Sequence, residues 1–308
     1  MAKTIGIVVL NYNTFDETVK CVDSIREHTT VGYRIYIVDN ASSDGSGDAL
    51  FNKYRKYADV LVLRNTKNSG YSAGNNVGIK QAEKDGYEYI AIVNSDVELL
   101  NDAFSIMIDT LKKYPDVLMI GPSVRDNNGK ESQIPRKKLT FKVFLLDRHP
   151  FCDILRRGTE PDRYYKVPAS GVSTFFGSVS GCCFVIKSSD FRLINRFDEN
   201  VFLYSEEDIL AYKMESMQRK AAVNVDAKVW HKANISTNKK GNAFVHFHRW
   251  TSVLYLLTHY AHISKFKQIL IVLWNTITWD LLSIVSKDYR DMNSDFRKRN
   301  WNIITRSE

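Results

Sequence analysis

Cysteine is scarce in this chain of 308 residues, and its four cysteines do not have the spacing of a metal site. Cys21 and Cys152 stand alone, while Cys182 and Cys183 are adjacent. Structural zinc sites need closely spaced pairs of Cys or His, which this pattern does not supply. The N-terminus also lacks the leader pattern of a secreted chain. We therefore expect reduced thiols in a cytoplasmic protein.

The glycine-rich loops of the common nucleotide-binding folds are absent as well. Neither GxGxxG nor GxxxxGK[ST] occurs, which argues against dinucleotide and ATP sites of those types. No nucleic-acid motif accompanies the net charge of +8. Residues 130–166 contain ten Lys and Arg against five acids, and the segment from His246 onward contains nine against five. These excesses suit an anionic membrane face or phosphorylated substrates better than nucleic acid.

What the chain does have is three nearly continuous apolar runs, each ending in Asn and Asp. They are Ile5–Asn13, Ile35–Asp44 and Tyr89–Glu98. Continuous rather than alternating apolar residues predict buried parallel strands, and the helical spacing between them predicts βαβ units. Such strands bring their carboxyl ends to one edge of the sheet, where α/β proteins bind ligands. The plainer alternative is that each cluster only ends a strand and caps a helix.

Several residues at this edge suit a nucleotide and a metal. Asp39 can accept a hydrogen bond from a pyrimidine base, and Tyr12 can lie against that base. Asp96 can hold Mg²⁺ or Mn²⁺ bridging a diphosphate, because hard cations prefer oxygen ligands. Residues Asn68–Gly78 form a Gly- and Asn-rich stretch where a backbone can approach a nucleotide. We expect a helix to follow this stretch and to run through Lys84.

A second acidic centre lies at Glu206-Glu207-Asp208. Three acids are ordinary in the first turn of a helix, but the apolar residues around them indicate that one carboxylate faces a cleft. Its pKa would then be raised, which makes it a usable base near neutral pH. His231 follows a predicted strand, Ala222–Trp230, and is a metal ligand, a phosphate partner or a structural histidine.

The remaining segments carry weaker patterns. Between residues 125 and 172 the pattern dissolves. Residues 126–129 predict a turn, with a hairpin as one alternative, and Pro135–Lys138 and Asp147–Lys166 predict loop. From Phe244 onward the chain is helical and aromatic. Its most apolar window, Phe266–Val285, is interrupted by Lys267 and Asp280, so we expect it to fall short of the roughly 20 apolar residues of a spanning helix. Packing on the domain, on a second copy, or flat on a membrane all stay open.

Taken in order, the motifs resemble those of inverting family 2 glycosyltransferases of the GT-A fold, most closely the bacterial rhamnosyl- and galactofuranosyltransferase-like branch. They are NYN, VDNxSxDGS, NxGYSAGNNxG, VNSDVEL, SGCCFVIK, FDExVFLYSEEDIL and WHK, between Ile5 and Thr237. The resemblance implies an α/β fold with a mostly parallel, Rossmann-like sheet flanked by helices. It implies a glycosyltransferase domain at residues 1–240, with a nucleotide-sugar half at 1–122 and an acceptor half at 123–240. Residues 241–308 would be a helical extension for packing, dimerisation or membrane association.

The resemblance also implies roles for the matching residues. A UDP- or dTDP-sugar would lie over the strand ends, Asp96 and His231 would hold Mg²⁺ or Mn²⁺, and Glu207 would deprotonate the acceptor hydroxyl. The residues implied at the donor are Leu10, Tyr12, Asp39, Asn40, Asn68, Gly70, Ala73, Asn75, Asn94 and Asp96. The acceptor would be a glycan or a lipid-linked sugar of bacterial cell-surface polysaccharide synthesis. The enzyme would work in the cytoplasm or peripherally on the inner face of the membrane, as a monomer or a homodimer.

Two departures from the family pattern leave alternatives open. Asn94 stands where the first acid of the DxD metal motif would be, so the metal would depend on Asp96, His231 and the diphosphate alone. The usual Glu-Asp pair is Glu206-Glu207 here, which leaves the adjacent Asp208 as a rival base. A catalytically silent partner subunit is therefore one alternative. A sugar nucleotidyltransferase is another, although the first strand is not followed by the basic Gly-rich loop it would need.

Overall fold

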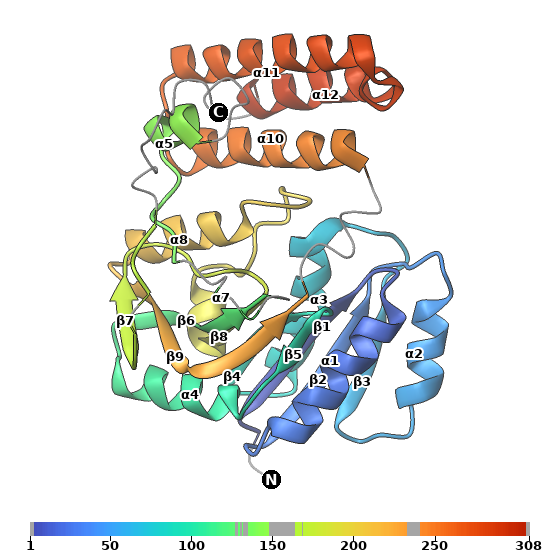
Figure 1. Ribbon diagram of the computed structural model, residues 1–308, viewed down its shortest axis with the longest axis vertical. Coiled ribbons are helices and arrows are strands. Elements are labelled where there is room, and N and C mark those ends of the chain that lie inside the picture. Colours follow the sequence, from blue (N-terminus) through green and yellow to red (C-terminus); the bar gives the residue numbers. More distant parts are fainter. Residues whose placement is uncertain are drawn as a thin grey trace.

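The structure is a computed structural model that describes residues 3–126, 129, 131, 135–147, 164–167, 169–232 and 241–305 (Figure 1). Cys152 and much of the basic stretch at residues 130–166 lie outside these ranges. The strands are β1 (Ile5–Asn11), β2 (Tyr33–Asp39), β3 (Val60–Arg64), β4 (Tyr89–Asn94), β5 (Val97–Leu99), β6 (Val117–Arg125), β7 (Val172–Phe175), β8 (Cys183–Lys187) and β9 (Lys220–His231). The helices are α1 (Phe15–His28), α2 (Ser46–Tyr54), α3 (Gly70–Lys84), α4 (Ala103–Lys113), α5 (Phe141–Asp147), α7 (Ser188–Leu193), α8 (Glu206–Ser216), α10 (Gly241–His259), α11 (Lys265–Val285) and α12 (Lys287–Thr305).

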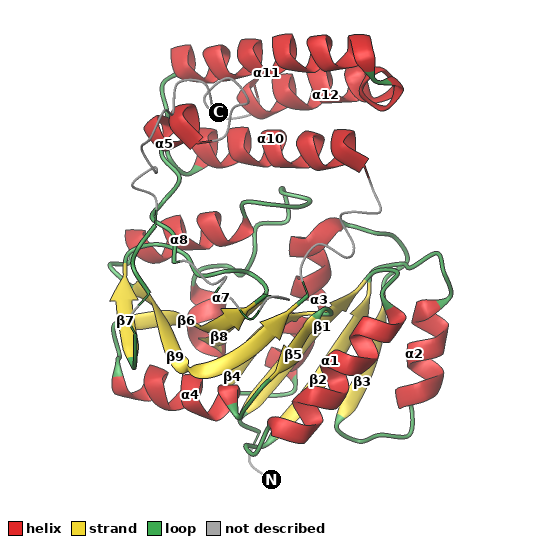
Figure 2. Ribbon diagram, in the orientation of Figure 1, coloured by secondary structure: helices red, strands yellow, loops and turns green. Residues whose placement is uncertain are grey.

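Across the described ranges, nine strands form one sheet (Figure 2). Its order is β3-β2-β1-β4-β8-β6-β9-β5, with β7 paired to β9. β1, β2, β3 and β4 are mutually parallel, as the three apolar runs predict. Beyond β4 the sheet is mixed, because β8 is antiparallel to β4 and β6, while β5 and β7 are antiparallel to β9.

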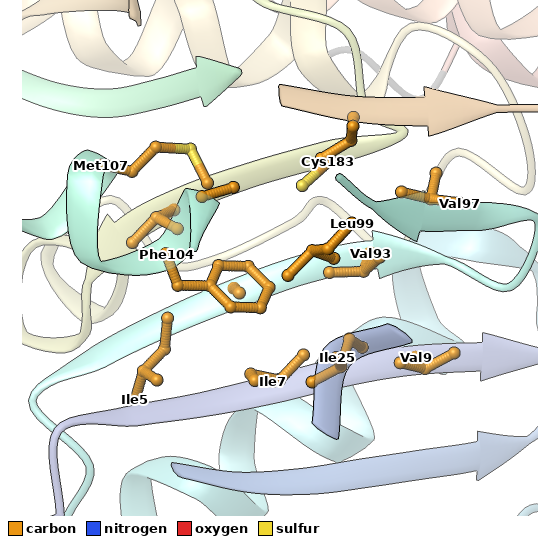
Figure 3. Close-up of a cluster of buried hydrophobic side chains, with 14 of the residues drawn as sticks. Ile5, Ile7, Val9, Ile25, Val93, Val97, Leu99, Phe104, Met107 and Cys183 are labelled. Atoms are coloured by element: carbon orange, nitrogen blue, oxygen red, sulfur yellow. The ribbon is translucent and has the colours of Figure 1, made fainter. Parts of the chain in front are cut away.

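Helices cover both faces of this sheet, which explains why its strands are apolar throughout rather than alternating. Successive side chains of a strand point to opposite faces. Ile7 and Val9 therefore join a core with α1, α2 and α4, to which Phe104 also belongs (Figure 3). Val8, between them in sequence, joins a second core with α3, α7 and α8.

Helix α3 begins earlier than the sequence predicts. The Gly- and Asn-rich stretch was expected to precede a helix, but the helix starts at Gly70 and includes most of that stretch. A Cβ atom at Gly74 would crowd Leu10, and one at Gly78 would crowd Val8. The glycines therefore serve close packing of a helix on β1, a long-range effect that local sequence does not reveal.

Three further features were not foreseen. The apolar run Tyr89–Glu98 gives the predicted strand, β4, which closes at Asn94, but its last residues begin a separate strand, β5, that turns back to pair antiparallel with β9. Between the two predicted loop stretches of the segment 125–172 lies a helix, α5. By length and composition alone, α11 is also apolar enough to cross a membrane, although one third of its most apolar window is buried (33%). Its Lys267 lies near the helix end, so the interruption is smaller than expected.

The last three helices form a separate layer above the sheet (Figure 1). α10 faces α8, and α11 and α12 lie side by side on the far side of α10. Ile209 of α8 and Leu254 of α10 belong to one apolar cluster, together with Ile271 of α11 and Ile303 of α12. The predicted helical C-terminal region is therefore confirmed, and it is packed onto the sheet-containing part of the molecule through α8.

Candidate active site

The carboxyl ends of β1, β2 and β4 meet at one edge of the sheet, as the three Asn- and Asp-tipped runs predict. Asn11 of β1 pairs with Asp39 of β2, and Leu10 pairs with Asn94 of β4. Tyr12 follows directly and is half-buried. This is the position at which open α/β sheets bind ligands, because the loops that leave the strands diverge there.

Asp39 is buried in a polar network at this edge. Its Oδ1 accepts hydrogen bonds from Asn11 Nδ2 at 2.8 Å and from Ser42 Oγ at 2.6 Å. A Cβ atom at Gly47, in the first turn of α2, would overlap the Asp39 carboxylate. The side chain therefore organises the turn into α2, which is the plainer role the sequence left open. Binding of a base by Asp39 stays a prediction.

Asn40 and Asn68 join β2 to the start of α3. Asn40 Nδ2 donates to Asn68 Oδ1 at 2.9 Å and to the Gly70 carbonyl at 3.1 Å. Gly70 has φ of +91°, and a Cβ there would overlap the carbonyl oxygen of Phe202. That carbonyl also accepts from the backbone N–H of Tyr71 at 2.7 Å. Glycine at position 70 is thus required both by its conformation and by the close approach of another segment.

Tyr71 connects α3 to the centre of the edge, a role that sequence reasoning missed. Its hydroxyl lies 3.1 Å from Asn94 Oδ1 and 2.8 Å from the Gly181 carbonyl oxygen. Asn75 Nδ2 donates to the Tyr71 carbonyl at 3.0 Å, and Ala73 is half-buried on the same helix. Burial, with Glu207 and Glu206 nearby, raises the pKa of Tyr71 well above its usual value, so the hydroxyl stays protonated.

Asp96 and His231 are brought together by the pairing of β5 with β9. Val97 is opposite His231 in this antiparallel register. As a result, His231 Nε2 lies 3.2 Å from Asp96 Oδ1, and both side chains are largely buried. Burial lowers the pKa of His231, but hydrogen bonds with Asp96 and Cys182 outweigh it and raise the pKa to about 10.

A divalent cation would have to displace the proton between Asp96 and His231 before both side chains could be its ligands, because only a neutral imidazole binds a metal. Mn²⁺ accepts both oxygen and imidazole ligands, with diphosphate oxygens and water filling its other positions. Among the residues that the structure describes, no group of three His, Cys, Asp or Glu side chains is arranged to hold a metal. Binding of a metal by Asp96 and His231 stays a prediction.

The three acids of α8 have different surroundings. Glu207 is half-buried, and its Oε1 accepts from the backbone N–H of Gly181 at 2.8 Å. A Cβ at Gly181 would overlap this carboxylate, which explains the glycine within an otherwise apolar segment. Asp208 is buried and lies 3.3 Å from Ser178 Oγ. Glu207 is thus tied to the same glycine as Tyr71, and Asp208 is turned into the protein.

The carboxyl group with a raised pKa is Glu206, to which the sequence argument gave no role. It is buried at the start of the helix. Burial, followed by the neighbouring charge of Glu207, raises its pKa to about 8. The residue before it, Ser205, has φ of +68°, and Tyr204 has φ of +71°. Two consecutive left-handed residues are strained conformations that fix how the helix start is presented.

Arg136 is a further residue that sequence reasoning missed. It lies in the segment predicted as loop, where it forms a two-way backbone bridge with Ser178 at 2.9 Å. Burial lowers the pKa of its guanidinium, but the charges of Glu207 and Asp208 outweigh burial and raise it. The positive charge of Arg136 therefore interacts favourably with the acidic centre. No local pattern could have placed it there, because the bridge joins segments 42 residues apart in sequence.

The family assignment comes from comparison with known proteins. The profile described as Glycosyl transferase family 2 matches residues 6–191, more than half of the chain. The chain belongs to glycosyl transferase family 2. It is 22% identical over 273 residues to the N-acetylglucosaminyl-diphospho-decaprenol L-rhamnosyltransferase of Mycobacterium tuberculosis, covering 85% of this chain and 86% of the relative. It is 26% identical to the poly(ribitol-phosphate) beta-glucosyltransferase of Bacillus spizizenii, covering 70% of this chain and 43% of the relative.

Solved structures agree on the fold. A mannosyltransferase from Pyrobaculum calidifontis, in complex with GDP-Man and Mn²⁺, superposes with a TM-score of 0.56 at 14% identity, covering 100% of this chain and 89% of that one. GalNAc-T7 with UDP, GalNAc and Mn²⁺ gives a TM-score of 0.61 at 14% identity, covering 83% of this chain and 48% of that one. The predicted GT-A fold is therefore confirmed, and this family 2 member is a glycosyltransferase.

Proposed function

We propose that this family 2 enzyme is a metal-dependent, inverting glycosyltransferase. It moves a sugar from a UDP- or dTDP-sugar to a hydroxyl group of a glycan or lipid-linked acceptor in bacterial cell-surface polysaccharide synthesis. The relatives support this reading, because the mycobacterial relative is named for rhamnosyl transfer to a decaprenol-linked sugar diphosphate. Two of the structural neighbours contain Mn²⁺, with UDP in one and GDP-Man in the other.

The observation that carries the proposal is the way the acidic groups converge on one edge of the sheet. Tyr71 bonds both Asn94, two residues before Asp96, and Gly181, whose N–H holds Glu207. Tyr71 is therefore bonded both to the segment that holds the candidate base and to the strand end that precedes the candidate metal ligand. We infer that the donor lies over the ends of β1, β2 and β4, lined by Leu10, Tyr12, Asp39, Asn40, Asn68, Gly70, Ala73, Asn75, Asn94 and Asp96.

The proposed reaction is a single displacement at the anomeric carbon. As the acceptor oxygen forms its bond to that carbon, its proton passes to Glu207, and the bond from carbon to the diphosphate oxygen breaks. Asp96 and His231 would hold the Mg²⁺ or Mn²⁺ ion, and that ion would supply positive charge to offset the charge of the departing diphosphate. Arg136 contributes a positive charge that interacts favourably with the acidic centre. Asp208, buried against Ser178, is the less accessible of the two candidate bases.

Nucleotide-sugar binding tests this proposal. Thermal unfolding is measured with each UDP- and dTDP-sugar, with and without Mn²⁺, for the wild type, Asp96→Ala and Asp109→Ala. Asp109 is the control, because it is an exposed acid on α4 that pairs with Lys112. A donor at 100 times its Kd should stabilise the wild type by about 2.7 kcal/mol.

We expect this metal-dependent stabilisation to be kept in Asp109→Ala and lost in Asp96→Ala. The matching donor should then be hydrolysed slowly without acceptor. Binding without hydrolysis or transfer would instead support a catalytically silent partner subunit, the alternative that Asn94 leaves open. If no nucleotide sugar shifts the wild type, the proposed donor site is wrong.

A further inference from the structure

Helix α11 has the reverse of the pattern expected for a helix that borders water, because several polar residues are buried and large apolar residues are exposed. Its buried positions include the polar residues Gln268, Asn275, Thr278 and Ser283. Its exposed positions, apart from two lysines at the N-terminal end, are large and apolar: Phe266, Ile269, Leu270, Leu273, Trp274, Ile277, Leu281, Ile284 and Val285. Their helical spacing makes one continuous apolar face along the whole helix. Such a face indicates a non-aqueous neighbour.

The packing of α12 argues against a membrane-spanning role for α11. α12 lies along α11 and carries eight charged residues between Lys287 and Arg299. Asp280 of α11 accepts hydrogen bonds from Asn293 at 3.1 Å and from Arg297 at 2.5 Å, both on α12. If α11 crossed a bilayer, this charged helix would have to enter the hydrocarbon with it, at a large cost. The apolar face can therefore meet lipid only with the helix lying in the plane of the surface.

The charges around the face select its partner. Residues 241–305 contain eight Lys and Arg against four Asp and no Glu. Lys265 and Lys267 are exposed at one end of α11, whereas beyond the other end the exposed Lys287 and Arg290 are balanced by the exposed Asp288 and Asp291. The C-terminal layer as a whole is cationic, so two copies that met through it would bring like net charge together. An anionic bilayer instead neutralises this charge, and polybasic segments gain about 1 kcal/mol per Lys or Arg near such a surface.

We propose that the outer face of α11 docks the enzyme on an anionic lipid bilayer, with the helix lying in the interface. Figure 1 places α11 in the layer farthest from the sheet, so the bilayer would lie beyond the C-terminal helices. Trp274, on this face, would sit among the headgroups, where indole rings are enriched. The docking surface is defined by its own residues and requires neither donor nor metal.

Vesicle co-sedimentation tests the proposal with the full chain. The vesicles contain phosphatidylcholine alone, or phosphatidylcholine with phosphatidylglycerol, at low and high salt. The test variant is Leu273→Glu with Leu281→Glu, both half-exposed on α11 (53% and 50%). The matched control is Leu193→Glu on α7, at an exposed leucine (66%) outside the C-terminal layer.

We expect the wild type and Leu193→Glu to bind the phosphatidylglycerol vesicles, more weakly at high salt. Binding of the double variant should be at least about a hundredfold weaker, since two leucines buried in the bilayer would each contribute roughly a factor of ten or more. Tryptophan emission should shift to the blue on binding, and Trp274→Phe should reduce that shift. Equal unfolding midpoints of all variants in solution would confirm that the exposed substitutions leave the fold intact.

Two results would overturn the proposal. One is that the wild type and the double variant bind the vesicles equally well, or that neither protein binds them. The other is a concentration-dependent dimer in solution that the double variant dissociates, which would assign the face to a second copy. Because donor binding is measured separately, a failure here leaves the proposed reaction standing, and failure of the reaction leaves the docking surface standing.

Discussion

At Gly70, both the positive φ and the close approach of Phe202 require glycine. Substitutions at two glycines can separate the energetic costs of these two effects. Gly86 has nearly the same left-handed backbone, with φ of +84°, but nothing lies within 4 Å of where its Cβ would be. We expect Gly86→Ala to lower the free energy of unfolding by about 1 kcal/mol, because alanine is strained in the left-handed conformation. Gly70→Ala adds the overlap with Phe202 and should cost about 3 kcal/mol or more. Urea unfolding measures both, and equal costs would refute the close approach.

The acids of α8 differ in access, which predicts different effects on rate. Glu207→Gln should lower kcat by roughly 10²–10⁴-fold while donor binding persists, because the variant keeps an oxygen for the Gly181 N–H but cannot take a proton. Asp208→Asn should keep most of its activity, since its carboxylate is buried against Ser178. Steady-state kinetics with a saturating donor distinguishes them. The reverse pattern would assign the base to Asp208.

Glu206 predicts a pH dependence of stability. Its pKa is about 8 in the folded protein, above the ordinary value for glutamate, so the folded state binds more protons in the window between the two values. The contribution of this group to stability is therefore greatest at low pH and is lost as pH rises through that window. Relative to the wild type, Glu206→Gln should become more stable by up to about 1.4 kcal/mol per pH unit. Urea unfolding across the window measures this, and a difference that does not change with pH would contradict it.

At the scale of elements, Tyr71 ties α3 to the segment that holds the candidate base. Tyr71→Phe leaves the Asn94 and Gly181 oxygens without this donor, and a buried unpaired group costs about 1–3 kcal/mol. Tyr57→Phe is the control, because Tyr57 is exposed (43%) and a surface change should stay within about 0.5 kcal/mol. We expect only Tyr71→Phe to lower both stability and kcat. An unaltered kcat would show that the tie does not position Glu207.

The elements also show which parts of the fold and site were predictable from the sequence. The strands β1, β2 and β4 can be recognised in the sequence, because burial of both faces makes them continuously apolar. Their polar ends predict the edge of the sheet where they meet. The Asp96–His231 contact is different, since it depends on β5 pairing with a strand more than a hundred residues later. From the residues alone, His231 was a metal ligand, a phosphate partner or a structural histidine, and only resemblance to a family favoured the metal. Arg136 had neither a local pattern nor a matching motif, so the tertiary bridge to Ser178 alone reveals it.

At the scale of the whole molecule, the C-terminal helices are bound to the rest by both apolar and polar contacts. Val201 and Ile209 are buried in the cluster that α10 completes. Asp198 accepts hydrogen bonds from Tyr255 at 2.9 Å and from Tyr260 at 2.7 Å, and these bonds help lower its pKa despite its burial. The boundary between residues 240 and 241 that the sequence predicts stays a proposal. Because of these contacts, it does not follow that the two parts fold independently.

A chain that ends at residue 240 answers that question. Removing the helices uncovers Val201, Ile209 and Leu139, which are now fully buried, and exposing three aliphatic side chains costs about 5 kcal/mol. For a chain of this size that loss corresponds to a midpoint lower by about 10–20 °C. A chain ending at Thr305 is the control and should melt like the full protein. Calorimetry or circular dichroism measures the midpoints. If the 240-residue chain unfolded at the same midpoint as the control, residues 1–240 would be an independent domain. The C-terminal layer would then not help to hold α8 and its acids in place.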